Sequence, residues 1–101
     1  MKLRLCWTLR ARADLRAIRH YIAHDHPVAA KRWIDRLRRR ARLAAASPLA
    51  ARIVPEIGRD DVREAIVGTY RLVYRVLPDS IHVLTVFEGH RQLSEDAFDV
   101  K

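Results

Sequence analysis

Basic side chains in the second half of the chain, together with one histidine, could perform phosphoryl chemistry. Guanidinium groups stabilise the pentavalent phosphate that forms when an RNA backbone is cut, and an imidazole can move a proton. The candidates are Arg63, Arg71, Arg75, His90 and Arg91. The order of the expected strands allows Arg71 and the segment after the last strand to meet at one edge of a sheet. The alternative interpretation is structural, with Arg63 and Arg71 pairing with backbone carbonyls and with carboxylates such as Glu56.

Metal binding and nucleophilic catalysis have weaker support in the sequence. His20 and His24 are four residues apart, so a helix would place both imidazoles on one face, but the glutamate and the third ligand of a zinc-protease motif are absent. Cys6 lies in an expected strand, where a cysteine is usually a small buried hydrophobe. With only 3 glycines, the chain has no glycine-rich phosphate loop of a familiar kind. We therefore expect neither a metal nor a cofactor.

Positive charge is concentrated in the first half of the chain. The formal net charge is +8, and residues 1–50 carry 13 basic and 3 acidic side chains, whereas residues 51–101 carry 7 and 9. Arginines are densest over residues 31–42, and the planar guanidinium suits phosphate or carboxylate. Such a field attracts nucleic acid, ribosomes or an acidic protein. The simpler interpretation is the solvated face of a helix.

Length and composition limit the class of protein. A chain of 101 residues is typical of one domain with one core, so residues 1–101 are expected to form a single domain. The single cysteine cannot form an internal disulfide, which favours a reducing cytoplasm. The N-terminal residues are too short a run, and too often interrupted by charge, for a secretion signal. No apolar run approaches the ~20 residues that cross a bilayer, so no membrane interaction is expected.

Two amphipathic helices are predicted in the first half, after a short strand over residues 2–7. Thr8 is placed to cap the first helix, which should stop near Pro27, and the second should begin at residue 25 or 26 and end by Ser47. The apolar stripes are Ala11, Leu15, Ile18 and Ile22 in the first helix and Ala30, Ile34, Leu37, Ala41 and Ala44 in the second. Two such helices with a short connection form an antiparallel hairpin.

Three runs rich in β-branched and aromatic residues follow, at 62–67, 70–76 and 81–87, and short turn sequences separate them. The apolar stripes of the two helices must be buried against another element, and the apolar face of the sheet must be shielded from water. Packing the helices on the sheet satisfies both requirements. The sequence therefore predicts an α+β fold, in which an N-terminal strand accompanies an antiparallel two-helix hairpin packed on a small curved antiparallel β-sheet. Residues 93–98 should form a last helical turn or an extended tail.

A series of short motifs occurs in order along residues 5–93. They are Trp7-Thr8, Ala13-Asp14-Leu15, Tyr21-Ile22, Val54-Pro55-Glu56, Arg63-Glu64, Tyr70-Arg71-Leu72-Val73-Tyr74-Arg75 and Val86-Phe87-Glu88-Gly89-His90-Arg91. This succession resembles the ParE/RelE toxin superfamily of bacterial type II toxin–antitoxin modules, and most of all its ParE branch. The residues that match the family's structural motif are Pro55, Glu56, Arg63, Glu64, Tyr70, Arg71 and Tyr74. The family's helical hairpin on a small sheet agrees with the fold derived from burial.

The resemblance implies a toxin that arrests growth. In the ParE branch the target is DNA gyrase, and in the RelE branch the protein is a ribosome-dependent mRNA endoribonuclease with, in this chain, Arg71, His90 and Arg91 as the matching catalytic residues. No tyrosine follows Tyr74 to move a proton, and Glu88 would repel an approaching phosphate. We therefore favour gyrase inhibition, in which the chain has no catalytic residue.

The same resemblance implies two macromolecular contacts. In the gyrase interpretation we assign the target contact to His90, Arg91 and Phe98, the last of which lies in the tail over residues 94–101.

The other contact is with a cognate antitoxin, whose acidic, disordered C-terminal tail would fold along the toxin to form a hetero-oligomer. We expect that tail to bind Trp33, Leu37, Arg36 and Arg40, because apolar edges and basic charge suit an acidic amphipathic helix. A third interpretation is a non-toxic RNA-binding module that uses the arginine-rich helix.

Overall fold

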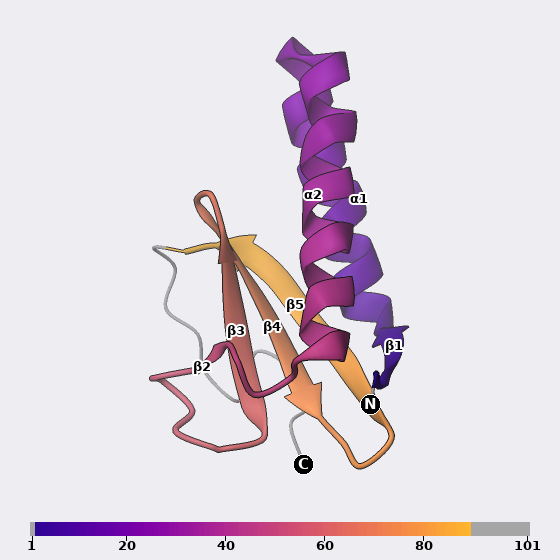
Figure 1. Ribbon diagram of the computed structural model, residues 1–101. Helices are drawn as coiled ribbons and strands as arrows, with labels where there is room; N and C mark the ends of the chain where they lie inside the picture. The colour runs from indigo at the N-terminus through magenta and orange to yellow at the C-terminus, as the bar shows by residue number, and fades with distance from the viewer. Residues whose placement is uncertain (1, 90–101) are drawn as a thin grey trace.

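The computed structural model describes residues 2–89, which form two helices against one five-stranded sheet (Figure 1). Within these residues the elements are β1 (Arg4–Trp7), α1 (Leu9–Asp25), α2 (Pro27–Ala46), β2 (Arg52–Ile53), β3 (Val62–Val67), β4 (Tyr70–Val76) and β5 (Ser80–Glu88). The helical hairpin and the three-strand meander have the bounds expected from the sequence to within about two residues. None of these helices is long and apolar enough to cross a membrane.

The sheet has the strand order β1-β5-β4-β3-β2. All neighbours are antiparallel except β1 and β5, which run parallel, with Arg4 opposite Ser80 and Trp7 opposite Val83. The expectation of an antiparallel sheet was therefore wrong for β1. The alternating pattern of a strand shows which side chains face the core, but it is the same for either direction of the partner strand. The short edge strand β2 was not predicted, because two residues are too few to show alternation.

The helix ends follow local sequence signals. Thr8 caps α1: its hydroxyl accepts a hydrogen bond from the amide of Ala11 at 3.1 Å and donates to the carbonyl of Val83 at 2.8 Å. Helix α1 ends just before His26, and Pro27 begins α2, where a proline needs no amide hydrogen. Thr8 thereby joins the start of α1 to the middle of β5.

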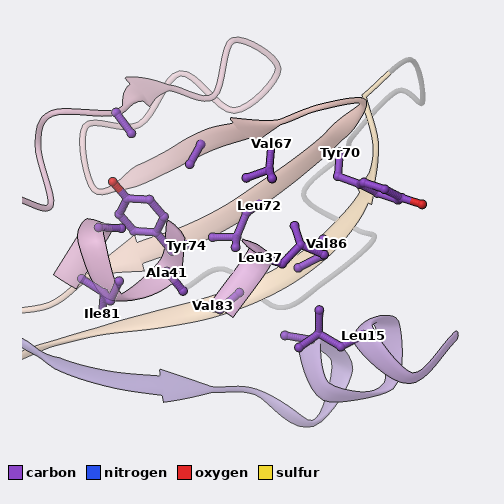
Figure 2. Packing of buried hydrophobic residues seen from close by; sticks show 14 of the residues in the cluster. Leu15, Leu37, Ala41, Val67, Tyr70, Leu72, Tyr74, Ile81, Val83 and Val86 are labelled. Atoms are coloured by element: carbon purple, nitrogen blue, oxygen red, sulfur yellow. The ribbon is translucent and has the colours of Figure 1, made fainter. Parts of the chain in front are cut away.

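The helical hairpin covers one face of the sheet. The lower parts of α1 and α2 lie against the strands, and their upper parts extend beyond the sheet (Figure 1). Leu37 from α2 packs among Leu72, Val83 and Val86 of the sheet, as Figure 2 shows, and both Leu37 and Leu72 are fully buried. The opposite face carries a smaller apolar cluster of Val54, Val62, Val73 and Leu84. Arg71 and Arg75 alternate with Val73 along β4 and point away from Leu72 and Tyr74 of the main core, so they lie on the same face as this second cluster.

Asp14 connects α1 to an irregularity in β5. The register between β4 and β5 shifts so that Leu84 has no partner across β4. There the Asp14 carboxylate accepts hydrogen bonds from the Thr85 hydroxyl at 2.5 Å and from the Val86 amide at 3.1 Å. The Ala13-Asp14-Leu15 motif thus holds the bulge against the helix.

Replacing Asp14 with alanine is expected to lower the free energy of unfolding by about 1–3 kcal/mol, because the buried Thr85 hydroxyl and the Val86 amide would lose their acceptor. Urea denaturation measures the change. Asp35→Ala is the matched control: Asp35 accepts from Lys31 on the surface, so its loss should cost much less than the loss of Asp14. Equal losses in the two variants would contradict the role given to Asp14.

Candidate functional site

Arg71 lies on the sheet face opposite the helices and is almost completely buried, with 5% of its surface exposed. Its guanidinium donates from Nε to Glu64 Oε1 at 2.6 Å and from Nη1 and Nη2 to the two oxygens of Glu56 at 2.7 and 2.8 Å. The guanidinium also lies 5.1 Å from the centre of the Phe87 ring. Arg71 is therefore held from three sides by residues of β3, β5 and the segment after β2.

The charges around Arg71 balance within the cluster. Glu64 is fully buried and also accepts a hydrogen bond from Nε of Arg52, which completes a row of alternating charges across β2, β3 and β4. The hydrogen bonds from Arg71 to Glu56 and Glu64 outweigh the effect of burial and raise the pKa of Arg71 above its ordinary value. Because each donor faces a carboxylate, Arg71 is not presented to a phosphate group here. The geometry is that of the structural interpretation.

A second ionic group, which the sequence did not predict, lies further along β4. Asp61 accepts hydrogen bonds from Arg59 at 2.8 and 3.0 Å and from Arg75 at 3.1 Å. Partial burial opposes its ionisation, but these hydrogen bonds outweigh that effect and hold the pKa of Asp61 below its ordinary value of 3.8. The pair of arginines ties the segment between β2 and β3 to the end of β4.

The low pKa of Asp61 predicts a pH-dependent contribution to stability. A carboxyl whose pKa is lower in the folded than in the unfolded chain stabilises the fold above its unfolded pKa, and this contribution disappears as the pH falls through the folded pKa. Asp61→Asn should therefore lower the free energy of unfolding near neutral pH and have a decreasing effect as the pH falls below about 4. Urea denaturation at a series of pH values tests this. An effect that is constant with pH would contradict it.

Arg63 and Tyr74 of the family motif have structural positions. Arg63 donates to the carbonyl of Ala51 at 3.0 Å and to the carboxylate of Asp60 at 2.8 Å, so it organises the chain on both sides of β2. The hydroxyl of Tyr74, a fully buried residue, donates to the carbonyl of Pro48 at 2.6 Å. Burial raises the pKa of Tyr74 above its ordinary value, which keeps the phenol in the neutral donor form.

Two further residues of the motif, Tyr70 and Pro55, differ in exposure. Tyr70 is buried beneath Trp33 with ring centres 5.5 Å apart, and Pro55 is exposed in the turn after β2.

The residues expected to bind an antitoxin do not form one exposed surface. Leu37 is completely buried beneath α2, so its assignment as an exposed apolar edge was wrong. Its position in the helical stripe is the reason: spacing identifies the buried face but not its margin. Trp33 is half-buried, with the guanidinium of Arg36 at 4.5 Å from its ring centre. Arg36 and Arg40 line a cleft between α2 and the β3–β4 hairpin, together with Leu43 and Ile66.

The remaining candidates belong to the C-terminal segment. His90, Arg91 and Phe98, and with them the expected structure of residues 93–98 and the tail over 94–101, lie outside the described residues. Within residues 2–89, no three histidine, cysteine, aspartate or glutamate side chains come together as a metal site. Cys6, expected to be buried in a strand, lies in β1 and is partly exposed.

The chain is similar to known proteins along most of its length. Residues 5–93 match the family described as "ParE toxin of type II toxin-antitoxin system, parDE". Toxin RelE2 of Caulobacter vibrioides is 35% identical over 85 residues, which are 84% of this chain and 93% of that protein.

Two solved structures share the fold. A chain of the chromosomal ParDE TA system from P. aeruginosa superposes with a TM-score of 0.71 at 22% identity, over 86% of this chain and 96% of that one. A mutant of E. coli toxin RelE in the free state superposes with a TM-score of 0.68 at 20% identity, over 89% and 86% of the two chains.

Proposed function

Since this chain belongs to the ParE toxin family of type II toxin–antitoxin systems, we propose that the target of this toxin is DNA gyrase. The observation that supports this proposal best is the environment of Arg71. An arginine that stabilises a pentavalent phosphate must direct donors at the reacting phosphate, whereas the donors of Arg71 point at Glu56 and Glu64. The described part of this sheet face thus favours inhibition by binding over phosphoryl chemistry.

The second candidate is a ribosome-dependent mRNA endoribonuclease of the RelE type. Its support is the 35% identity with a protein named Toxin RelE2, over 84% of this chain. In this alternative Arg71, His90 and Arg91 carry the chemistry, as the family resemblance implies.

A comparison of isolated targets separates the two candidates. Expression of the toxin alone should arrest growth with an SOS response, and the purified chain should convert gyrase and plasmid DNA into cleaved complexes. Ribosomes translating a reporter mRNA should leave that mRNA intact. Ribosome-dependent cuts that disappear in His90→Ala, with gyrase unaffected, would overturn the proposal in favour of the endoribonuclease. No arrest and no effect on either target would reject both.

We further propose where the cognate antitoxin binds. Leu43 and Ile66 are 57% and 52% exposed in the cleft that Arg36 and Arg40 line, and the cleft lies beside Trp33. In the described residues β2 pairs with β3 only at Arg63 and Glu64. Exposed apolar side chains, arginines and an uncovered strand edge suit an acidic tail that adds both a strand and an apolar helix face.

Leu43→Asp and Ile66→Asp, separately, should weaken the complex with the protein encoded by the neighbouring reading frame, as measured by calorimetry with purified components. Leu9→Asp changes a leucine at the start of α1 that is more exposed still, at 83%, and serves as the control. If Leu9→Asp weakens the complex as much as the two cleft variants do, the binding site lies elsewhere.

A further inference from the structure

The helical hairpin carries the whole net charge of the protein. Residues 9–46 contain 11 basic and 3 acidic side chains, a net of +8, and the remaining residues contain 9 of each sign. Two of the three hairpin carboxylates are engaged: Asp14 accepts from Thr85 and Val86, and Asp35 pairs with Lys31 at 3.0 Å. Among the described residues outside the hairpin, 7 side chains are basic and 6 are acidic, so the fold separates a nearly charge-balanced sheet from a strongly basic hairpin.

Arginines of the sheet and of the hairpin also differ in their partners. In the sheet region Arg52, Arg59, Arg63, Arg71 and Arg75 all pair with carboxylates. In the hairpin Arg12, Arg16, Arg19 and Arg38 are exposed, and within residues 2–89 none of them forms an ion pair. Like charges held together without ion-pair partners repel one another, so this arrangement suits an anionic ligand.

These four arginines line one cleft, which we call the arginine cleft. Arg12, Arg16 and Arg19 are four and three residues apart and share a face of α1, and Arg38 comes from α2. Trp7, Leu15 and Ile34 form the floor, and the cleft has a volume of about 360 Å³. It is distinct from the cleft of Arg36 and Arg40, since the two share no lining residue.

The floor of the arginine cleft decides which polyanion fits. Leu15 and Ile34 are only 6% and 4% exposed, so an amphipathic acidic peptide would find little apolar surface to bury. Trp7 is partly buried and packs against the core of the protein, so it offers less free ring surface than the accessible aromatic rings on which proteins that bind single strands stack bases. The cleft presents guanidinium groups at fixed positions on two packed helices. This arrangement of positive charge complements the dense, regular phosphate charge of a duplex.

We propose that the arginine cleft binds the phosphate backbone of duplex DNA, without reading its sequence. This activity goes beyond the proposed action on gyrase, because it belongs to the toxin alone and needs no gyrase. It would place the toxin directly on the DNA on which its proposed target works.

Fluorescence anisotropy of the full-length chain with a short labelled duplex tests the inference, at roughly 50 to 200 mM potassium chloride. Four phosphate contacts predict that the logarithm of the binding constant falls with the logarithm of salt concentration with a slope of about −3.6. The variant Arg12→Gln/Arg16→Gln should reduce the magnitude of that slope by about 1.8 and weaken binding by about tenfold or more at the lower salt concentration.

Arg32→Gln/Arg39→Gln is the matched control, because it removes the same charge from two exposed arginines of α2 outside the arginine cleft. Equal weakening by both double variants would show attraction by net charge alone and overturn the inference. Preference for single-stranded RNA or for poly-glutamate over the duplex would also overturn it.

Measuring both gyrase poisoning and DNA binding on the same unchanged chain separates this inference from the proposed target. DNA binding through the cleft by a chain that leaves gyrase unaffected would reject the target and retain the DNA site. Gyrase poisoning without binding of free DNA would reject the DNA site and retain gyrase as the target.

Discussion

Replacing Arg71 with alanine is expected to lower the free energy of unfolding by about 3–5 kcal/mol, because it leaves Glu64 buried with a charge that Arg52 alone must balance. Glu56 would lose both of its hydrogen bonds from the guanidinium. For a chain of this length the melting temperature should fall by about 12 °C or more, which thermal unfolding measures. This is the largest effect that we expect of any single substitution in the charged cluster.

Arg4→Ala is the control for the loss of an arginine in an ion pair. Arg4 lies 3.6 Å from Asp79, and both side chains are mostly exposed, so the cost should stay below about 1 kcal/mol. Adding Glu64→Gln to Arg71→Ala removes the stranded charge and should restore part of the lost stability. If Arg71→Ala costs no more than Arg4→Ala, Arg71 does not stabilise the sheet.

The same pair of variants bears on mechanism. Should Arg71→Ala abolish toxicity, the loss has two explanations: unfolding of the chain or removal of a reacting group. Toxicity that returns when Glu64→Gln restores stability would assign Arg71 a structural role. Toxicity that stays absent in a stable double variant would favour the endoribonuclease alternative.

Replacing Gly68 with alanine is expected to cost about 2–5 kcal/mol, which combines backbone strain with overpacking. Gly68 lies in the β3–β4 turn with a φ of 60°, and an added Cβ would clash with the tip of the Trp33 ring. Trp33 cannot move without losing its contacts with Tyr70 and Arg36. The measurement is the free energy of unfolding from urea denaturation.

Gly58→Ala separates the two causes. Gly58 has a φ of 69°, but nothing lies within 4 Å of its added Cβ, so this variant should show the strain alone, about 1 kcal/mol. In a Trp33→Leu background, Gly68→Ala should lower the free energy of unfolding by about as little as Gly58→Ala does, because the ring that the added Cβ would meet is gone. Equal costs for the two glycines in the unchanged background would mean that Trp33 does not pack on the turn.

The candidate site was only partly predictable. As one of two interpretations, the sequence suggested that Arg71 pairs with carboxylates such as Glu56, and the structure confirms that contact. It did not predict Glu64 as the second partner of Arg71. It missed Asp61 with its two arginines, and it gave no signal that Asp14 would hold the bulge in β5. It also placed the binding surface of α2 on Leu37, which the structure buries. Except for the local pair of Arg59 and Asp61, each error concerns residues whose environment comes from distant parts of the chain.

The sequence by itself determined the two helices, the three-strand meander and the side of each helix that is buried. These properties follow from periodicity and from end signals such as Thr8 and Pro27, which act over a few neighbouring residues. Only the tertiary structure decided that β1 runs parallel to β5, that Arg71 is neutralised and that unpaired arginines of both helices line one cleft. Arg71 and Glu56 are 15 residues apart and Thr85 and Asp14 are 71 apart, so their contacts depend on how the layers pack and not on local spacing.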